Sequence, residues 1–298
     1  MQSLPYDKSE VEALIRASLP REDGLQRTVI RAMREAVENG GKRIRPILLF
    51  ESCKCFAEAR GESGWKEEAA PFLSALEMIH SFSLVHDDLP CMDNDILRRG
   101  KPTTWYVYGE AMGTLAGDGL VLEALTLAGK AVAASKHPER AARALAILGE
   151  KSGVFGMLGG QSVDVEKTGE RLDATTLDFI YRLKTGALLE AAFMMGAALG
   201  GATEEELRIA EQIGAAVGLA FQIRDDILDE TASEAELGKP LHSDEKNQKT
   251  TYVSLYGLES AKEAVRQQSE IAAQRLKGFP GDTKCLAALI AYLTDRNF

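Results

Sequence analysis

The sequence has no excess of basic residues. Its 35 lysines and arginines are outnumbered by 45 aspartates and glutamates, which gives a formal net charge of -10 at pH 7. A general nucleic-acid binder carries a basic patch or stripe, so we expect no nucleic-acid partner. A small anionic substrate is not excluded, because a local basic cluster or a bound metal ion reverses the electrostatic potential inside a single cleft.

Cysteines are also few, at four. Cys53 and Cys55 lie too close in sequence to favour a disulfide, and no CxxC pair indicates a zinc site. The start of the chain, MQSLPYDKSEVEALI, lacks the basic segment and apolar core of a signal peptide. These features predict reduced thiols and a cytoplasmic location.

Long hydrophobic runs and strand patterns are lacking as well. The most apolar windows, residues 72–85 and 187–199, are interrupted by Glu77, His80 and Glu190. A membrane span needs about 18–20 apolar residues, so none is expected. Alternation of apolar and polar residues with a period of two is scarce, which argues against a sheet.

Helical periodicity dominates instead. Apolar side chains recur at three-residue steps in FLSALEMIHSFSLVH, and glycine or proline divides the chain into roughly ten or more helices. No low-complexity linker separates two halves, so we predict one all-α domain over residues 1–298, built as a helical bundle. Several helices are apolar around much of their circumference, which suits a thick bundle or a dimer interface.

Two acidic motifs end apolar segments: DDLPCMD begins at Asp87, and DDILD begins at Asp225. Asp225 and Asp229 are four residues apart and share a helix face, with Gln222 on the same side. Ionised aspartates at a core-facing site require cations beside them. Because the donors are hard oxygen ligands without histidine or cysteine, they favour Mg²⁺, with Mn²⁺ as the alternative.

The first motif needs a local distortion to form such a site. Asp87 and Asp93 are six residues apart, which places them about 120° apart on an unbroken helix. Pro90 disturbs the hydrogen bonding of a helix, so we predict a bulge that brings Asp93 back beside Asp87. One acid pair alone is typical of a solvated helix end, whereas two such motifs favour a metal site.

Basic residues cluster where a diphosphate bound to such metals would need them. Mg²⁺ held by few carboxylates keeps coordination positions for water and substrate phosphate. Lys184 interrupts a strongly apolar helix, which is unfavourable without an anionic partner. The basic residues form three groups along the chain: Lys42, Arg43 and Arg45; Arg98, Arg99 and Lys101; Lys184, Lys239 and Lys249.

These motifs occur in a recognisable order. GGKRIRP, HSFSLVHDDLPCMDND, GGQSVDV, LKTGALLEAA and FQIRDDILD follow one another as they do in trans-prenyl diphosphate synthases. Over roughly residues 25–257 the chain resembles bacterial farnesyl diphosphate synthases most. The resemblance implies an all-α bundle around a deep central cavity, usually a homodimer. It also implies a head-to-tail condensation, in which isopentenyl diphosphate attacks the cation left when dimethylallyl or geranyl diphosphate loses its diphosphate.

The resemblance also assigns roles to residues. The principal ligands of about three Mg²⁺ ions would be Asp87, Asp93 and Asp225. Residues supporting these ions directly or through water would be Asp88, Asp226 and Asp229. The allylic diphosphate would be held by Arg98, Lys184 and Lys239. The diphosphate of isopentenyl diphosphate would be held by Lys42, Arg45, His80 and Arg99. Thr185 and Gln222 would direct dipoles at the developing cation, and Gln161 and Asp164 would support these groups from behind.

Product length is expected to depend on residues one turn before Asp87. A bulky Phe82 would form a floor for the growing chain, and a small Ser83 would line its path. The resemblance then implies a C15 product, farnesyl diphosphate. Three alternatives stay open: a geranylgeranyl (C20) synthase with the same motifs, a class I terpene cyclase, and a non-catalytic subunit of the same fold. A cyclase would not need a second diphosphate site, and a non-catalytic subunit would be expected to lose one acidic motif.

Overall fold

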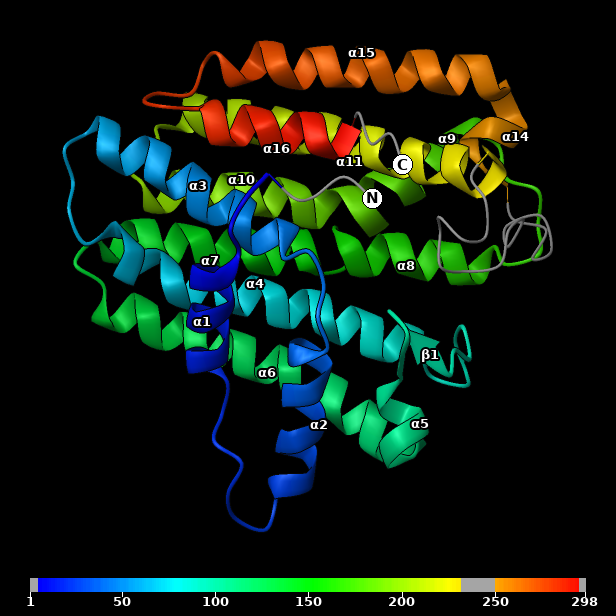
Figure 1. Cartoon of the computed structure of the whole chain (residues 1–298), viewed down its shortest axis with the longest axis horizontal. Coiled ribbons are helices and arrows are strands. Elements are labelled where there is room, and N and C mark those ends of the chain that lie inside the picture. Colours follow the sequence, from blue (N-terminus) through cyan, green and yellow to red (C-terminus); the bar gives the residue numbers. More distant parts are fainter. Residues whose placement is uncertain (1–4, 232–249, 295–298) are drawn as a thin grey trace.

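The fold is a stack of helices. A computed structural model of the chain describes residues 5–231 and 250–294. Figure 1 shows most helices running side by side along the long axis, while α1 and α2 lie across them. The helices are α1 (Ser9–Ser18), α2 (Arg27–Glu38), α3 (Ile44–Ala59), α4 (Trp65–Asp87), α5 (Thr104–Tyr108), α6 (Glu110–Ala134), α7 (Pro138–Ser152), α8 (Met157–Glu166), α9 (Ala174–Ile180), η1 (Tyr181–Gly186), α10 (Ala187–Leu199), α11 (Glu204–Thr231), α14 (Tyr252–Tyr256), α15 (Leu258–Leu276) and α16 (Lys284–Thr294).

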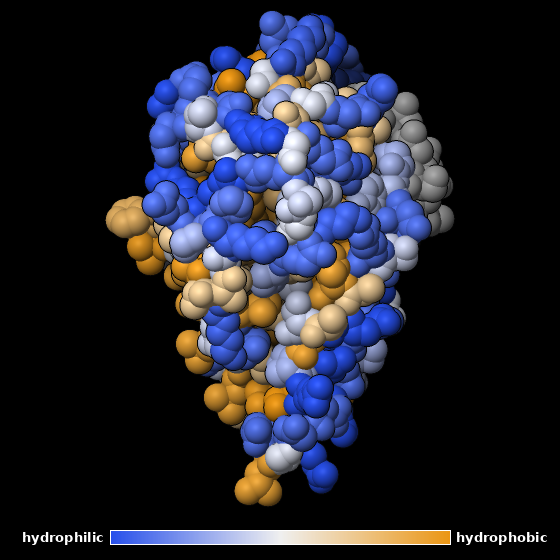
Figure 2. Space-filling view, turned by 90° about the vertical axis from the view of Figure 1, so that its left-hand side faces the viewer, coloured by the Kyte–Doolittle hydropathy of each residue, from blue (hydrophilic) through white to orange (hydrophobic). Residues whose placement is uncertain are grey.

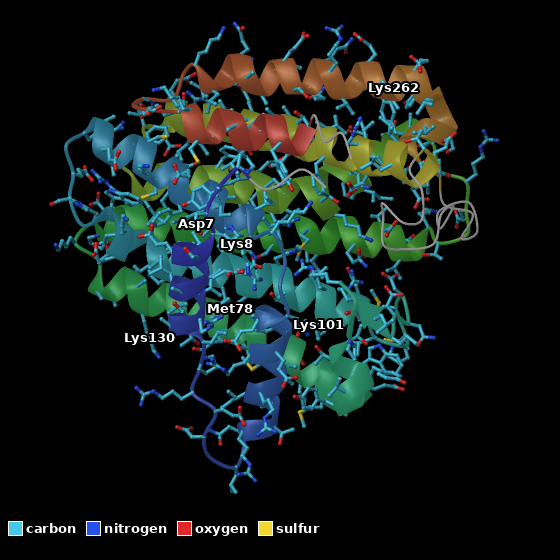
Figure 3. All side chains as sticks on the ribbon, in the orientation of Figure 1. Asp7, Lys8, Met78, Lys101, Lys130 and Lys262 are labelled. Atoms are coloured by element: carbon cyan, nitrogen blue, oxygen red, sulfur yellow. The ribbon has the colours of Figure 1, made fainter. Side chains whose placement is uncertain are left out.

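The centre of the stack is built from helices that are apolar on every side, so the all-α prediction is confirmed. Nearly every residue of α10 is buried, because it packs against α3, α7 and α11 at once. Met78, in the middle of α4, is fully buried. In Figure 3 it lies inside the stack, whereas Lys101, Lys130 and Lys262 extend from the outer elements. Burial of these apolar faces is the main stabilising contribution to the bundle.

The first acidic motif lies where α4 ends. The helix stops at Asp87 rather than continuing through a bulge, so the predicted bulge is corrected to a terminating turn. The amide of Asp93 donates to the carbonyl of Asp87 at 2.8 Å, and this bond brings the chain back on itself. Pro90 lies inside the turn, where the helix no longer needs its missing N–H. The predicted return of Asp93 toward Asp87 therefore occurs by a different route.

A small hairpin follows this turn. Strands β1 (Leu97–Arg98) and β2 (Lys101–Pro102) pair in antiparallel fashion, and they form the sheet of the described residues. Arg99 and Gly100 between them both have positive φ, at 55° and 73°. Two consecutive residues with positive φ are typical of the tight hairpin turn that matches strand twist. The turn directs Arg99 back toward α3.

A π-helical segment was not apparent in the sequence. The pattern LDFIYRLKTGALLEAAFMMGAALG predicts one continuous helix, but residues 181–186 within it form the π-helix η1. Such segments are rare, and they occur often at functional sites because they displace side chains from regular helical positions. Here η1 contains both Lys184 and Thr185.

One described helix, α6, is long and apolar enough to cross a membrane by length and composition alone. Its 25 residues have only 33% of their most apolar window buried. Core helices of soluble proteins also meet this criterion, so it is weak evidence for a span. Three of its leucines, Leu115, Leu122 and Leu125, are exposed.

Candidate active site

A cavity of about 610 Å³ opens between the start of α3, α4, η1 and α11. It contacts residues that the sequence predicted to hold one diphosphate (Lys42, Arg45, His80 and Arg99), to face the cation (Thr185 and Gln222) and to bind Mg²⁺ (Asp225). A smaller cavity of about 130 Å³ shares Thr185 and Gln222 with it and is also lined by Asp164, Lys184 and Asp226. The fold thus gathers groups from four separate helices around one cleft.

Asp87 lies beside this cleft without lining either cavity. Burial raises the pKa of its carboxyl, the charge of Lys184 opposes that rise, and the charge of Asp93 adds to it. Gln161 on α8 donates from Nε2 to Asp87 Oδ1 at 2.8 Å. Gln161, which the resemblance predicts to support the site from behind, is thus joined directly to Asp87.

Asp88 is buried and faces a different direction. Its Oδ1 accepts from Nε of Arg98 at 2.5 Å, and Arg98 also reaches Asp95 at 3.3 Å. Burial raises the pKa of Asp88 to about 6, although the guanidinium of Arg98 acts in the opposite direction. Asp88 thus fixes the position of Arg98. In this arrangement Asp88 would support a metal site only indirectly.

The aspartates of the second acidic motif differ in their surroundings. Asp225 lines the larger cavity, whereas Asp226 and Asp229 are buried. Asp226 Oδ2 accepts from the hydroxyl of Tyr181 at 2.5 Å and from the backbone N–H of Tyr252 at 2.8 Å. Asp226 therefore ties α11 to η1 and to the start of α14.

Lys184 and Thr185 have partners across the cleft. Lys184 Nζ donates to Asp164 Oδ2 at 2.5 Å, which supplies the anionic partner that an apolar helix requires. Thr185 Oγ1 donates to Gln222 Oε1 at 2.7 Å. Because the Gln222 oxygen accepts this bond, the pair holds one fixed orientation at the wall shared by the two cavities.

The basic wall of the larger cavity contains a neutral histidine. Arg45 Nη1 lies 3.3 Å from His80 Nε2, and because arginine only donates, His80 accepts. Burial and the charges of Arg45 and Arg99 hold the pKa of His80 well below its usual value. Burial also lowers the pKa of Arg45 to about 10, with the charge of Glu77 opposing that shift. Lys42 lies over the ring of Tyr292, 5.4 Å from its centroid.

Comparisons with known proteins agree with this geometry. The profile of the family described as "Polyprenyl synthetase" matches residues 26–288. A farnesyl diphosphate synthase of Geobacillus stearothermophilus is 40% identical, with 99% of this chain and 97% of the relative covered. The chain belongs to the polyprenyl synthetase family. It is a prenyl diphosphate synthase, and family members of this kind act on isopentenyl and allylic diphosphates.

Other relatives of this polyprenyl synthetase differ in product. A chloroplastic geranylgeranyl pyrophosphate synthase of Capsicum annuum is 44% identical, covering 87% of this chain and 68% of that protein. The crystal structure of an FPP/GFPP synthase from Zymomonas mobilis has a TM-score of 0.82 at 31% identity, covering 96% of this chain and 95% of that one. A geranyltransferase from Legionella pneumophila has a TM-score of 0.81 at 29% identity, covering 97% and 95%.

The oxygen donors of this polyprenyl synthetase fit Mg²⁺, the ion that the family generally uses. In the described residues no three His, Cys, Asp or Glu side chains converge on one point. Such a sparse donor set suits Mg²⁺, which keeps several waters and takes substrate phosphate as a ligand. Gln161 Oε1 is buried beside Asp87 without a hydrogen-bond partner, so an acceptor is available for a cation or its water. Asp87, Asp93 and Asp225 would hold the ions.

Sequence reasoning missed several residues of the site. In the sequence Glu77 stands out only as an interruption of an apolar window, yet it lines the large cavity. Its spacing of three from His80 was the available signal, because residues three apart share a helix face. Tyr181 and Tyr252 carried no such signal, since their contacts with Asp226 join distant segments. Lys239 and Lys249 lie outside the described residues.

Proposed function

We propose that this prenyl diphosphate synthase makes farnesyl diphosphate, by condensing isopentenyl diphosphate with dimethylallyl and then geranyl diphosphate. The observation that carries the C15 assignment is the packing of Phe82, which is half-buried on α4. Its ring meets the imidazole of His86 edge-on, with centroids 5.6 Å apart. A ring held by such a contact is a firmer floor for a growing chain than a freely rotating one.

The position of His86 depends on a glycine in α6. A Cβ on Gly117 would come within 2.1 Å of His86 Nε2, so a side chain here would displace the imidazole. His86 Nε2 also lies 3.1 Å from the carbonyl oxygen of Thr114, on the same helix. The proposed floor therefore consists of Phe82 backed by His86. The imidazole of His86 packs against α6 because Gly117 has no side chain there.

The chemistry follows from the charges around the cleft. Mg²⁺, when bound, would act as a Lewis acid on the departing diphosphate. Arg98 and Lys184 would hold the allylic diphosphate and stabilise the negative charge that develops on it. Thr185 and Gln222 would face the cation with fixed dipoles. Isopentenyl diphosphate, held by Lys42, Arg45 and His80, would then attack, and the released diphosphate would accept the proton that leaves.

Two other classes of function fit the observations less well. A class I terpene cyclase binds one diphosphate, whereas the cationic wall of the large cavity lies apart from the smaller cavity with Lys184. A non-catalytic subunit would not need both acidic motifs, and both are intact in the sequence. A C20 synthase is the remaining candidate, and it is favoured by the geranylgeranyl pyrophosphate synthases among the relatives.

One incubation separates these possibilities. The full chain is supplied with isopentenyl diphosphate, geranyl diphosphate and Mg²⁺, and product length is read by chromatography. We expect a C15 product as the main species. A main product of C20 would replace the assignment with the alternative, and no turnover after trials with Mg²⁺ and Mn²⁺ would favour the non-catalytic subunit. Replacing Asp225 with alanine should abolish turnover, and full activity in that variant would contradict the metal assignment.

We also propose that the enzyme is a homodimer joined through α6. Leu115, Leu122 and Leu125 follow one face of that helix and are 54%, 65% and 41% exposed. Exposed apolar patches of this kind mark association sites, and a second copy of the same face is self-complementary around a two-fold axis. Figure 2 shows a mainly hydrophilic upper surface, with apolar residues gathered along the left-hand edge and lower down.

A cytoplasmic location is part of the same proposal. It rests on the four cysteines, which are all free thiols, because thiols persist in reducing compartments. Fractionation of the source cells with an antibody to the chain would test it, and recovery with membranes or the medium would contradict it.

A further inference from the structure

The cationic wall of the large cavity contains a buried carboxylate. Glu77 of α4 is 3% exposed and lines the same cavity as Lys42, Arg45 and Arg99. A diphosphate would be repelled by a bare carboxylate there, and an ionised carboxylate in the interior is unfavourable without a partner. Some group must therefore neutralise Glu77 if this wall is to bind an anion.

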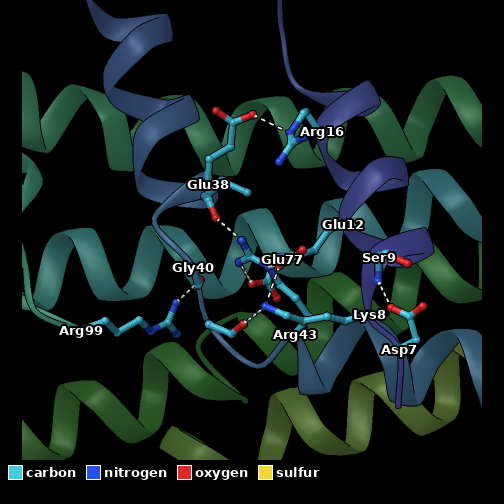
Figure 4. Close-up of polar contacts among 12 residues, drawn as sticks. Asp7, Lys8, Ser9, Glu12, Arg16, Glu38, Gly40, Arg43, Glu77 and Arg99 are labelled. Atoms are coloured by element: carbon cyan, nitrogen blue, oxygen red, sulfur yellow. Dashed lines mark hydrogen bonds and ion pairs between the residues drawn. The ribbon is translucent and has the colours of Figure 1, made fainter. Parts of the chain in front are cut away.

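Arg43 supplies that neutralisation. Its Nη1 donates to Glu77 Oε1 at 2.6 Å, and its Nη2 donates to the carbonyl oxygen of Val37 at 2.7 Å. Only 6% of Arg43 is exposed, and the residue lines the same cavity as Glu77. Figure 4 shows Arg43 and Glu77 together between α1, α2 and α4. Two nitrogens of this guanidinium are thus engaged within the protein, whereas Nε is buried without a hydrogen-bond partner.

The backbone at Arg43 is held in an unusual conformation. Arg43 has a φ of 55°, in the left-handed region, directly before α3 begins. Residues other than glycine rarely adopt this region unless surrounding contacts hold them there. Because Lys42 and Arg45 lie on either side, the conformation of Arg43 sets the directions of both neighbours.

Helix α1 braces the same loop from outside. Lys8 Nζ donates to the carbonyl oxygen of Gly41 at 3.0 Å and to Glu12 Oε1 at 2.8 Å. Glu12 Oε1 in turn lies 3.8 Å from Arg43 Nε. On the opposite side, Arg99 Nη1 donates to the carbonyl oxygen of Gly40 at 2.6 Å. All of these contacts are drawn in Figure 4, and they converge on the loop before α3.

We propose that Arg43 and Glu77 form a positioning pair for the isopentenyl diphosphate subsite, in which Glu77 fixes the guanidinium of Arg43 in the cavity wall and Arg43 neutralises Glu77. Arg43 is then a positioning residue, although it stands between two expected phosphate ligands in the motif GGKRIRP. The charge of Glu77 also opposes the lowering of the pKa of Arg45 and Arg99 by burial. This inference rests on the proposed function of the cavity.

The test is a double-mutant cycle with R43Q, E77Q and R43Q/E77Q, measuring kcat and the KM of each substrate. R43Q leaves a bare buried carboxylate in the cavity, so the KM for isopentenyl diphosphate should rise about tenfold or more. The double variant removes both charges and leaves a neutral amide at each position, so that KM should return to within about threefold of wild type. The KM for geranyl diphosphate should stay within about twofold in every variant, because its subsite lies elsewhere.

Each outcome bears on a different statement. If Arg43 bound phosphate itself, R43Q/E77Q would be as impaired as R43Q, and this result would overturn the proposal. An equal rise in both KM values would also overturn it. If R43Q does not fold, the KM of the double variant for isopentenyl diphosphate, compared with that of wild type, still tests the proposal. R140Q is the matched control, because it breaks an arginine–carboxylate pair of 2.6 Å with Glu62 away from the cleft, and it should leave both KM values unchanged. A wild-type chain without turnover would refute the proposed function instead.

Discussion

At the scale of the residue, function depends on which atoms are already occupied. The aspartates of the two motifs look equivalent in sequence, but Asp88 is engaged by Arg98, and Asp226 by Tyr181 and Tyr252. Asp225 lines the larger cavity, and Asp87 accepts a hydrogen bond from Gln161 beside it. A carboxylate that already accepts short hydrogen bonds has fewer lone pairs for a metal ion, so the motif alone does not define the ligand set.

Phe82→Ala tests the proposed floor. Removal of the ring should raise the ratio of products longer than C15 to farnesyl diphosphate by about tenfold or more, because discrimination by an apolar pocket changes steeply with its volume. Products are read by chromatography after incubation with geranyl and isopentenyl diphosphates. Phe179→Ala is the control, since that phenylalanine is 43% exposed on α9. An unchanged product profile in the Phe82 variant would contradict the assignment of Phe82 as the floor for the growing chain.

The neutral His80 gives a pH dependence to stability. The pKa of His80 in the folded state lies below its unfolded value, so the folded state binds fewer protons than the unfolded state. The contribution of His80 to the free energy of unfolding is therefore fully present above about pH 6.5. As the pH falls below that value, the free energy of unfolding should decrease by at most about 1.4 kcal/mol per pH unit. Urea unfolding at pH 7.0 and 5.5, at one protein concentration, should show a smaller loss in His80→Gln than in wild type. His137→Gln, at an exposed histidine, should behave as wild type.

At the scale of the element, the π-helix η1 and its neighbours decide where the cationic side chains lie. Helix α8 approaches η1 so closely that a Cβ on Gly160 would come within 2.2 Å of the backbone nitrogen of Lys184. Gln161 and Asp164 on α8 hold Asp87 and Lys184 in place. The spacing of these two elements therefore fixes groups on both sides of the cleft.

Gly160→Ala should force the two elements apart. We expect a loss of about 1–3 kcal/mol in the free energy of unfolding, because the clash involves backbone atoms. We also expect kcat to fall about tenfold or more, because the diphosphate groups lose their alignment. Steady-state kinetics and urea unfolding measure the two effects. Gly149→Ala is the control, because no atom lies within 4 Å of its added methyl in α7. A fully active Gly160→Ala enzyme would contradict this account.

At the scale of the whole molecule, the exposed apolar face of α6 is the surface that the single chain leaves uncovered. An apolar helix with only 33% of its most apolar window buried is expected to find a partner. The proposed second copy would cover it and would also support the helix against which His86 and Phe82 pack.

Leu122→Glu tests this assembly. The wild type should have the mass of a dimer by light scattering after size exclusion, and the variant should be largely monomeric, because a charge on each copy would be buried against its equivalent. Ile271→Glu, at a residue 43% exposed on α15, should remain a dimer. A monomeric wild type would refute the proposed dimer, and recovery only in detergent would favour a membrane surface instead.

The sequence by itself determined the helical class, both acidic motifs, the basic groups and the family, because helical periodicity and motif spacing are local properties. Only the tertiary structure decided which groups are engaged. Arg43 with Glu77, Gln161 with Asp87, and Tyr181 with Asp226 are joined across 34, 74 and 45 residues of chain. The π-helix also escaped prediction, because its residues fit a regular helical pattern equally well. Long-range packing selects such partners, and no local pattern records the choice.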